Sequence, residues 1–119
     1  MPVTTADLRA ILSNLPAVEE SIAYSTPIFK VGKTMLARLR DDGVLVLKVD
    51  LMTRDVLLDT NPDAFFLEDH YRGHPLVLVN LAAVKEDRLS PLLAASWRMV
   101  APKRLVREYS QECGAGIHR

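Results

Sequence analysis

Residues 34–49 read TMLARLRDDGVLVLKV and carry the clearest structural pattern of the sequence. Two strand-like runs flank Asp41-Asp42-Gly43, a three-residue loop whose last residue is glycine. Such a loop is typical of a β-hairpin with a type I turn and a G1 bulge. The sequence therefore predicts antiparallel strands at 34–40 and 44–49. The expected cross-strand pairs are Arg40 with Val44, Arg38 with Val46, and Leu36 with Lys48.

This register gives the hairpin two unlike faces. An antiparallel sheet commonly buries one face and leaves the other solvated, and a shift of one residue exchanges the two. The basic face, with Arg38, Arg40 and Lys48, should meet water or a ligand. Lys30 joins that face if the turn at Gly32 spans three residues, and points the other way if it spans two. The opposite face is wholly apolar and should lie under helices: Met35, Ala37, Leu39, Leu45, Leu47 and Val49.

Two helices are predicted at the ends of the domain. Thr4 and Asp7 have capping-box spacing before an apolar stripe, which predicts a helix from about residue 5 to residue 15. A second apolar stripe predicts a long helix that begins near Asp87 and directs Trp97 into the core of the protein. If Ser90 is its cap instead, Pro91 takes the favoured first helical position. A further helical piece should cover residues 103–109.

Shorter elements fill the rest of the chain. Strands are expected at 21–24 and 28–31 before the hairpin, and at 64–68 and 76–81 after it. A helix over about 53–60, capped by Asp50 or Thr53, should point Val56, Leu57 and Met52 inward. Residues 69–75 form a polar loop that holds His70, Tyr71 and His74.

Length and composition bound the fold class. The 119 residues carry no formal net charge and one cysteine, so neither a disulfide nor a cysteine zinc site is expected. We expect an α+β two-layer sandwich, in which helices pack on one face of an antiparallel sheet. One domain should span residues 1–109, with a flexible tail at 110–119. The absence of an apolar run of about 20 residues favours a cytoplasmic protein with no membrane partner.

The sequence holds no complete catalytic or metal-binding motif. His70 and His74, with Glu68 and Asp69 beside them, occupy a loop rather than one helix face. The serines lack a nucleophile-elbow setting, and Cys113 lies in the expected tail. We therefore expect no catalytic residue, no metal and no cofactor, and a protein that is more simply a binding module than an enzyme.

The order of several short motifs resembles the MmcQ/YjbR-like family of small bacterial proteins. The matching stretches are Leu15-Pro16-Ala17-Val18-Glu19-Glu20, Thr26-Pro27-Ile28-Phe29-Lys30-Val31, Ala37-Arg38-Leu39, Leu47-Lys48-Val49, Phe66, His70-Tyr71-Arg72-Gly73-His74-Pro75, Ser96-Trp97, and Val100-Ala101-Pro102-Lys103-Arg104-Leu105. The resemblance covers about residues 6–108. It implies a two-layer α+β fold similar to frataxin-like CyaY domains, and a suggested DNA-binding role.

Two functions follow as hypotheses. The first is a non-enzymatic module that binds nucleic acid, DNA included, without sequence specificity. In such a module, lysines and arginines neutralise phosphates while bases stack on an aromatic ring. The second is a domain that binds a small anionic ligand or a protein and has no nucleic-acid partner. The oligomeric state stays open. The candidate binding residues are Lys30, Arg38, Arg40, Lys48, His70, Tyr71, Lys103 and Arg104.

Overall fold

The computed structural model describes residues 3–23 and 25–109, so the expected tail and Tyr24 lie outside the described residues. Its elements are α1 (Thr5–Ser13), β1 (Val18–Ala23), β2 (Thr26–Val31), β3 (Thr34–Leu39), β4 (Val44–Lys48), α2 (Leu51–Thr60), β5 (Phe65–Phe66), the 3-10 turn η1 (Asp69–Tyr71), β6 (Leu76–Asn80) and α3 (Glu86–Val100). A last helix covers 103–109. The described strands form one sheet in the order β1-β2-β3-β4-β6-β5.

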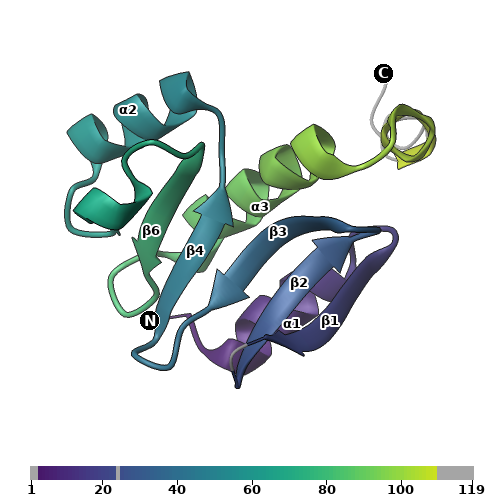
Figure 1. Ribbon diagram of the computed structural model, residues 1–119, viewed down its shortest axis with the longest axis horizontal. Coiled ribbons are helices and arrows are strands. Elements are labelled where there is room, and N and C mark those ends of the chain that lie inside the picture. The colour runs from purple at the N-terminus through teal and green to yellow at the C-terminus, as the bar shows by residue number, and fades with distance from the viewer. Residues whose placement is uncertain (1–2, 24, 110–119) are drawn as a thin grey trace.

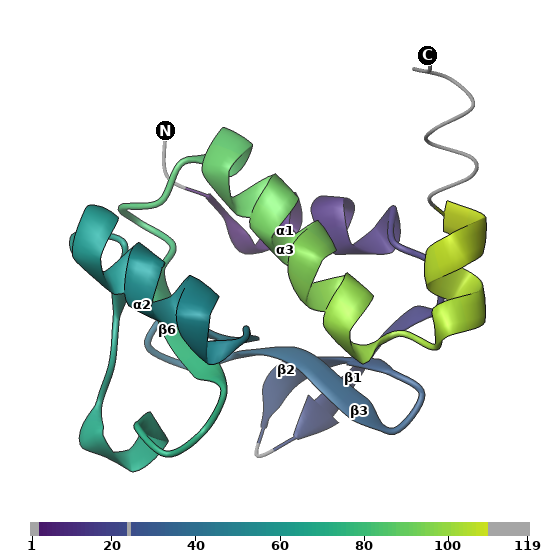
Figure 2. The same ribbon diagram turned by 90° about the horizontal axis from the view of Figure 1, so that it is seen from above.

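Every neighbouring pair of strands in this sheet is antiparallel, which confirms the α+β class. Figures 1 and 2 show α1, α3 and helix 103–109 on one side of the sheet. The segment with η1 lies on the opposite side (Figure 2). α2 contacts β5 and β6, whereas α3 contacts β3 and β4. In the described part of the chain, no helix is long and apolar enough to cross a bilayer.

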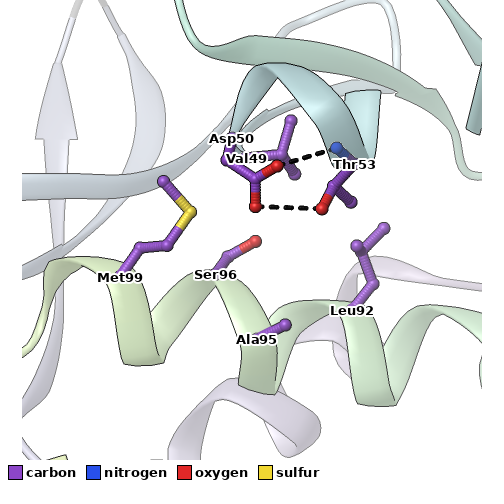
Figure 3. A pocket seen from close by; sticks show the side chains of 7 residues that line it. All are labelled: Val49, Asp50, Thr53, Leu92, Ala95, Ser96 and Met99. Atoms are coloured by element: carbon purple, nitrogen blue, oxygen red, sulfur yellow. Dashed lines mark hydrogen bonds between the residues drawn. The ribbon is translucent and has the colours of Figure 1, made fainter. Parts of the chain in front are cut away.

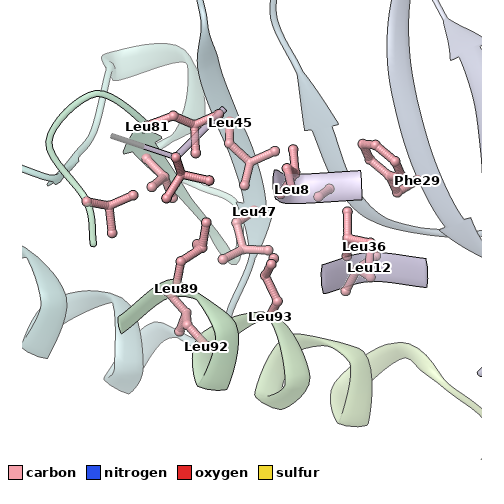
Figure 4. Close-up of a cluster of buried hydrophobic side chains, with 14 of the residues drawn as sticks. Leu8, Leu12, Phe29, Leu36, Leu45, Leu47, Leu81, Leu89, Leu92 and Leu93 are labelled. Carbon is pink, nitrogen blue, oxygen red and sulfur yellow. The ribbon is translucent and has the colours of Figure 1, made fainter. Parts of the chain in front are cut away.

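The main core lies between the sheet and the helices α1 and α3. Leucines from α1, α3 and the strands meet there (Figure 4), and Leu8, Leu36, Leu47 and Leu93 have no exposed surface. Trp97 is also fully buried, as its helical stripe predicts, and its indole Nε1 donates a hydrogen bond of 2.8 Å to the Pro16 carbonyl. This bond satisfies the one polar group of the ring in an apolar setting.

The hairpin follows the predicted register at two of the three expected pairs, and the expected pair of Leu36 with Lys48 is absent from the register that the structure describes for β3 and β4. Arg38 pairs with Val46, and the Arg40 amide donates to the Val44 carbonyl at 2.8 Å. Gly43 adopts a φ of 83°, a left-handed conformation that suits glycine because it has no Cβ. The strands end one residue earlier than expected, at Leu39 and Lys48.

A β-bulge corrects the expected division of the two faces. Phe29 pairs with Ala37 and Lys30 with Met35, so Leu36 is the extra residue on β3. An extra residue reverses the alternation of side chains along one strand. Leu36 is therefore buried in the core, and Met35, which was expected in the core, lies on the other face of the sheet.

The caps of α1 and α2 are confirmed, whereas the end of α1 and the inward face of α2 differ from expectation. Thr4 and Asp7 form the expected capping box on α1, which ends at Ser13 rather than at residue 15. The α2 helix is capped by Asp50 and begins at Leu51. Its predicted inward face is wrong for two residues, since Met52 is 78% and Val56 is 55% exposed. Only Leu57 of the three packs against the core.

The start of α3 agrees with expectation, whereas the strand after α2 is shorter than expected. α3 begins at Glu86, one residue before Asp87, with Lys85 as its N-cap. The alternative with Ser90 as the cap is wrong, and Pro91 lies inside the helix. Acidic residues in the first turn favour this earlier start because they face the positive end of the helix dipole. The strand expected at 64–68 is limited to Phe65–Phe66. Residues 103–109 are helical as predicted.

Candidate functional site

The candidate site lies on the face of the sheet opposite α1 and α3, here called the outer face. The strand register places four of the predicted basic residues there: Lys30, Arg38, Arg40 and Lys48. The turn after Val31 spans two residues, because Val31 pairs with Thr34. Without the bulge at Leu36, Lys30 would share a face with the core residues of β3. The bulge places Lys30 and Arg38 on the same face of the sheet.

The centre of the outer face is apolar and buried. Ile28, Val46 and Leu78 are at most 8% exposed, although none of them belongs to the main core. Val46 and Leu78 are cross-strand partners. The segment 67–75, here called the cover loop, lies on this side of the sheet (Figure 2). A small apolar cluster therefore lies under the loop that joins β5 to β6.

Three arginines hold the cover loop. Arg40 forms an ion pair of 3.0 Å with Glu68, and Arg38 donates a hydrogen bond of 3.3 Å to the Tyr71 hydroxyl. From α2, the guanidinium of Arg54 donates to the carbonyl oxygens of Arg72 at 3.2 Å and His74 at 2.9 Å. Arg38 belongs to β3, Arg40 follows the end of that strand, and Arg54 belongs to α2, so the loop is fixed at separate points along its length.

Arg40 is neutralised within the protein. It contacts Asp42 as well as Glu68, and both contacts are ion pairs. Hydrogen bonds to Asp42 and then to Glu68 raise the pKa of Arg40, while the hydrogen bond from Arg40 lowers the pKa of Asp42. Two carboxylates around one guanidinium leave no excess positive charge for a ligand.

Arg38 has a different setting. Its side chain is half-buried, and it donates to a neutral hydroxyl, that of Tyr71. Within residues 3–23 and 25–109, no carboxylate lies at ion-pairing distance from Arg38. The His70 ring meets the Tyr71 ring edge to face, with centroids 5.0 Å apart. Arg38 thus contacts the hydroxyl of Tyr71, whose ring in turn contacts His70.

The other four basic residues predicted as ligand contacts lie on both sides of the sheet. Lys30 and Lys48 are half-buried on the outer face, and the cross-strand partner of Lys30 is Glu19. Lys103 and Arg104 are exposed on helix 103–109, which lies on the side of α1 and α3 (Figure 2). The structure therefore brings together six of the eight predicted residues and separates Lys103 and Arg104 from them.

Sequence reasoning missed the residues that hold the cover loop. Glu68 and Arg54 both contribute to it, yet neither was a candidate. Their partners lie 28 and 20 residues away along the chain, so only the folded sheet reveals the pairs. Among the described residues, no three histidine, cysteine or acidic side chains are grouped so that they could hold a metal ion.

Comparison with known proteins identifies the family. The family model YjbR matches residues 13–99. The chain belongs to the YjbR family. The match includes β1 to β6 and nearly all of α3, and it therefore covers the outer face and the cover loop. Lys103 and Arg104 fall beyond it.

Relatives of the YjbR chain extend this finding without naming a ligand. Uncharacterized proteins of Mycobacterium tuberculosis and Mycobacterium bovis are 28% identical to it over 127 residues, which cover 93% of this chain and 98% of theirs. The crystal structure of Deinococcus radiodurans protein DR2400, with the family-model domain DUF419, matches with a TM-score of 0.73 and 28% identity. That match covers 100% of this chain and 99% of the other.

Proposed function

We propose that this YjbR protein is a non-enzymatic binding module that holds nucleic acid, DNA included, on the outer face of its sheet without sequence preference. The observation that carries the proposal is Arg38, a half-buried guanidinium with a neutral hydroxyl partner and no carboxylate at ion-pairing distance among the described residues. Guanidinium groups bind phosphate oxygens through charge-assisted hydrogen bonds.

The neighbours of Arg38 suit a single strand better than a duplex. The rings of Tyr71 and His70 can stack on bases, and stacking is tolerant of sequence because every base has a π-face. Lys30 and Lys48 add positive charge on the same face. The chain has no net charge, so binding should be weak and should depend strongly on salt. A bacterial cytoplasmic location belongs to the same proposal, because the relatives are bacterial and the chain has a single cysteine.

The test is a fluorescence-anisotropy titration with a labelled single-stranded oligodeoxynucleotide, first at low salt. We expect micromolar binding that weakens as salt is raised. Arg38→Gln should weaken it by roughly tenfold or more, because a charge-assisted hydrogen bond is lost. Lys103→Gln is the matched control: it also removes one positive charge, but from the other side of the sheet, and it should leave affinity nearly unchanged. Absence of binding at low salt would refute the proposal.

A compact anionic ligand is the second candidate. It is favoured by the limited extent of the available positive charge, since Arg40 is neutralised by Asp42 and Glu68 and Lys30 faces Glu19 across the strands. A thermal-shift titration with a nucleoside monophosphate and with oligonucleotides of increasing length separates the two. A true ligand raises the melting temperature with its concentration. A compact site gives the same shift at every length, whereas a strand-binding surface gives a larger shift with longer oligonucleotides.

A further inference from the structure

A small hollow with a cavity volume of about 20 Å³ lies between the start of α2 and the second half of α3 (Figure 3). Pockets for drug-sized molecules span about 300–1,000 Å³, so this hollow admits only a small head group, and the rest of a ligand would lie along its rim. α3 contributes residues at helical spacing that share one face of the helix. The lining residues are Val49, Asp50, Thr53, Leu92, Ala95, Ser96 and Met99.

Ser96 supplies a buried polar atom without a partner. The residue is 1% exposed, and its hydroxyl has no hydrogen-bond partner among the described residues. In Figure 3 the hydroxyl points into the space between Asp50 and Thr53. A buried hydroxyl that makes no hydrogen bond destabilises a fold, and each such group in a native structure calls for an explanation.

Asp50 and Thr53 place two more oxygen atoms at the same hollow. The Asp50 carboxylate accepts a hydrogen bond of 2.7 Å from the Thr53 amide and one of 2.9 Å from the Thr53 hydroxyl. The backbone hydrogen bond from Thr53 lowers the pKa of Asp50, which is therefore ionised at neutral pH. An ionised carboxylate has further acceptor positions, and the Thr53 oxygen can still accept because its proton is directed at Asp50.

These groups favour a positively charged ligand over a negatively charged one. An anion at the start of α2 would meet the charge of Asp50, and the Thr53 amide already donates to that carboxylate. An ammonium group has three donors and no acceptor, which matches three oxygen atoms. The other walls are formed by Val49, Leu92, Ala95 and Met99, which suit methylene groups. Met99 is 46% exposed, and methionine adapts its shape readily to an apolar neighbour.

We propose that this hollow binds the ammonium end of a short, unbranched alkyl chain, with the ammonium group among Asp50, Thr53 and Ser96 and the methylenes against Leu92 and Met99. Two sources share this chemistry, a free alkylamine and the lysine side chain of another protein. The site is separate from the outer face, and the proposal does not depend on nucleic-acid binding.

The test is a titration of the isotope-labelled full chain with n-butylammonium, followed by two-dimensional amide NMR. We expect saturable shifts at Thr53, Ser96 and Met99, with a dissociation constant on the order of millimolar for so small a ligand. Butanol and butyrate, which keep the alkyl chain but lack the ammonium group, should give no saturable shifts there. Acetyl-lysine methylamide distinguishes the sources: tighter binding than butylammonium indicates a protein lysine, and weaker binding indicates a free amine.

Variants separate the charge from the fold. Asparagine is as good an N-cap as aspartate, so Asp50→Asn should keep α2 while weakening butylammonium binding by roughly tenfold or more. Asp55→Asn removes a carboxylate from the same helix outside the hollow and should bind as the parent does. Ser96→Ala should weaken binding less than Asp50→Asn. The proposal is overturned by absent shifts, by equal shifts with butanol, or by unchanged affinity in Asp50→Asn.

Discussion

Leu47 on the core face and Leu78 on the outer face are both fully buried, yet they lie under unlike covers. Leu47 belongs to the core under α1 and α3. Leu78 lies outside that core, on the side of the cover loop, which polar contacts from Arg38, Arg40 and Arg54 hold in place. Apolar side chains of helices thus cover one face of the sheet, whereas a loop fixed by arginine contacts covers the other.

The largest expected effect tests that division directly. Leu47→Ala should lower the free energy of unfolding by about 2–5 kcal/mol, because the helices cannot close on the cavity. Leu78→Ala should cost less, at about 2 kcal/mol, since a loop relaxes into a gap more easily. Urea denaturation of both variants measures the difference. Equal costs would mean that the cover loop is as rigid as the helical layer.

Arg54→Met probes the hold of α2 on the cover loop. The change removes two hydrogen bonds to the carbonyls of Arg72 and His74. We expect a loss of about 1.5–3 kcal/mol, the range for hydrogen bonds to charged groups. Faster amide exchange in residues 67–75, with unchanged exchange in α3, should accompany it. Uniformly faster exchange would show that Arg54 acts on the whole fold instead.

Glu68→Gln sharpens the contrast between Arg40 and Arg38. The side chain of Glu68 is 46% exposed, so the loss of this ion pair should cost no more than about 1 kcal/mol. Part of the charge on Arg40 becomes available, and oligonucleotide affinity at low salt should rise modestly if the outer face binds nucleic acid. Asp69→Asn, which removes a carboxylate that pairs only with Arg72 in the described residues, is the control. An equal rise in both variants would point to net charge alone.

The smallest effect is a pH dependence on the outer face. The hydrogen bond from Arg40 lowers the pKa of Asp42 below its ordinary value of 3.8. A carboxyl group with a lowered pKa in the folded state stabilises the protein above its unfolded pKa, and that contribution disappears as the pH falls through the folded pKa. The melting temperature of the parent should therefore exceed that of Asp42→Asn at about pH 6, and the gap should close below pH 3.8. A gap that stays constant with pH would contradict this expectation.

Local features of this fold can be predicted from the sequence well, and long-range ones poorly. The capping box of Thr4 and the burial of Trp97 follow from periodicity and spacing within a few turns of chain. The bulge at Leu36 reverses a period-two pattern without any glycine to announce it. The apolar character of Met52 and Val56 predicts an inward position, but the α2 helix covers only the margin of the sheet and leaves them exposed.

The candidate site shows the same limit. Strand alternation alone predicts that Arg38, Arg40 and Lys48 share one face, and the register of the sheet confirms it. Alternation carries no information about which carboxylate neutralises which arginine, because Glu68 reaches Arg40 only after the cover loop has folded over the sheet. The difference between an engaged Arg40 and an available Arg38 therefore emerges only from three-dimensional contacts.

The contact between Trp97 and the chain around it gives the protein an optical reporter. Trp97 is the single tryptophan of the sequence, its indole is hydrogen-bonded to Pro16, and its ring lies 5.1 Å from that of Tyr109 on helix 103–109. One chromophore thus contacts the segment between α1 and β1, belongs to α3, and packs against the last described helix. Its emission should be blue-shifted in the folded protein. Detachment of helix 103–109 alone should change that emission before the sheet itself melts.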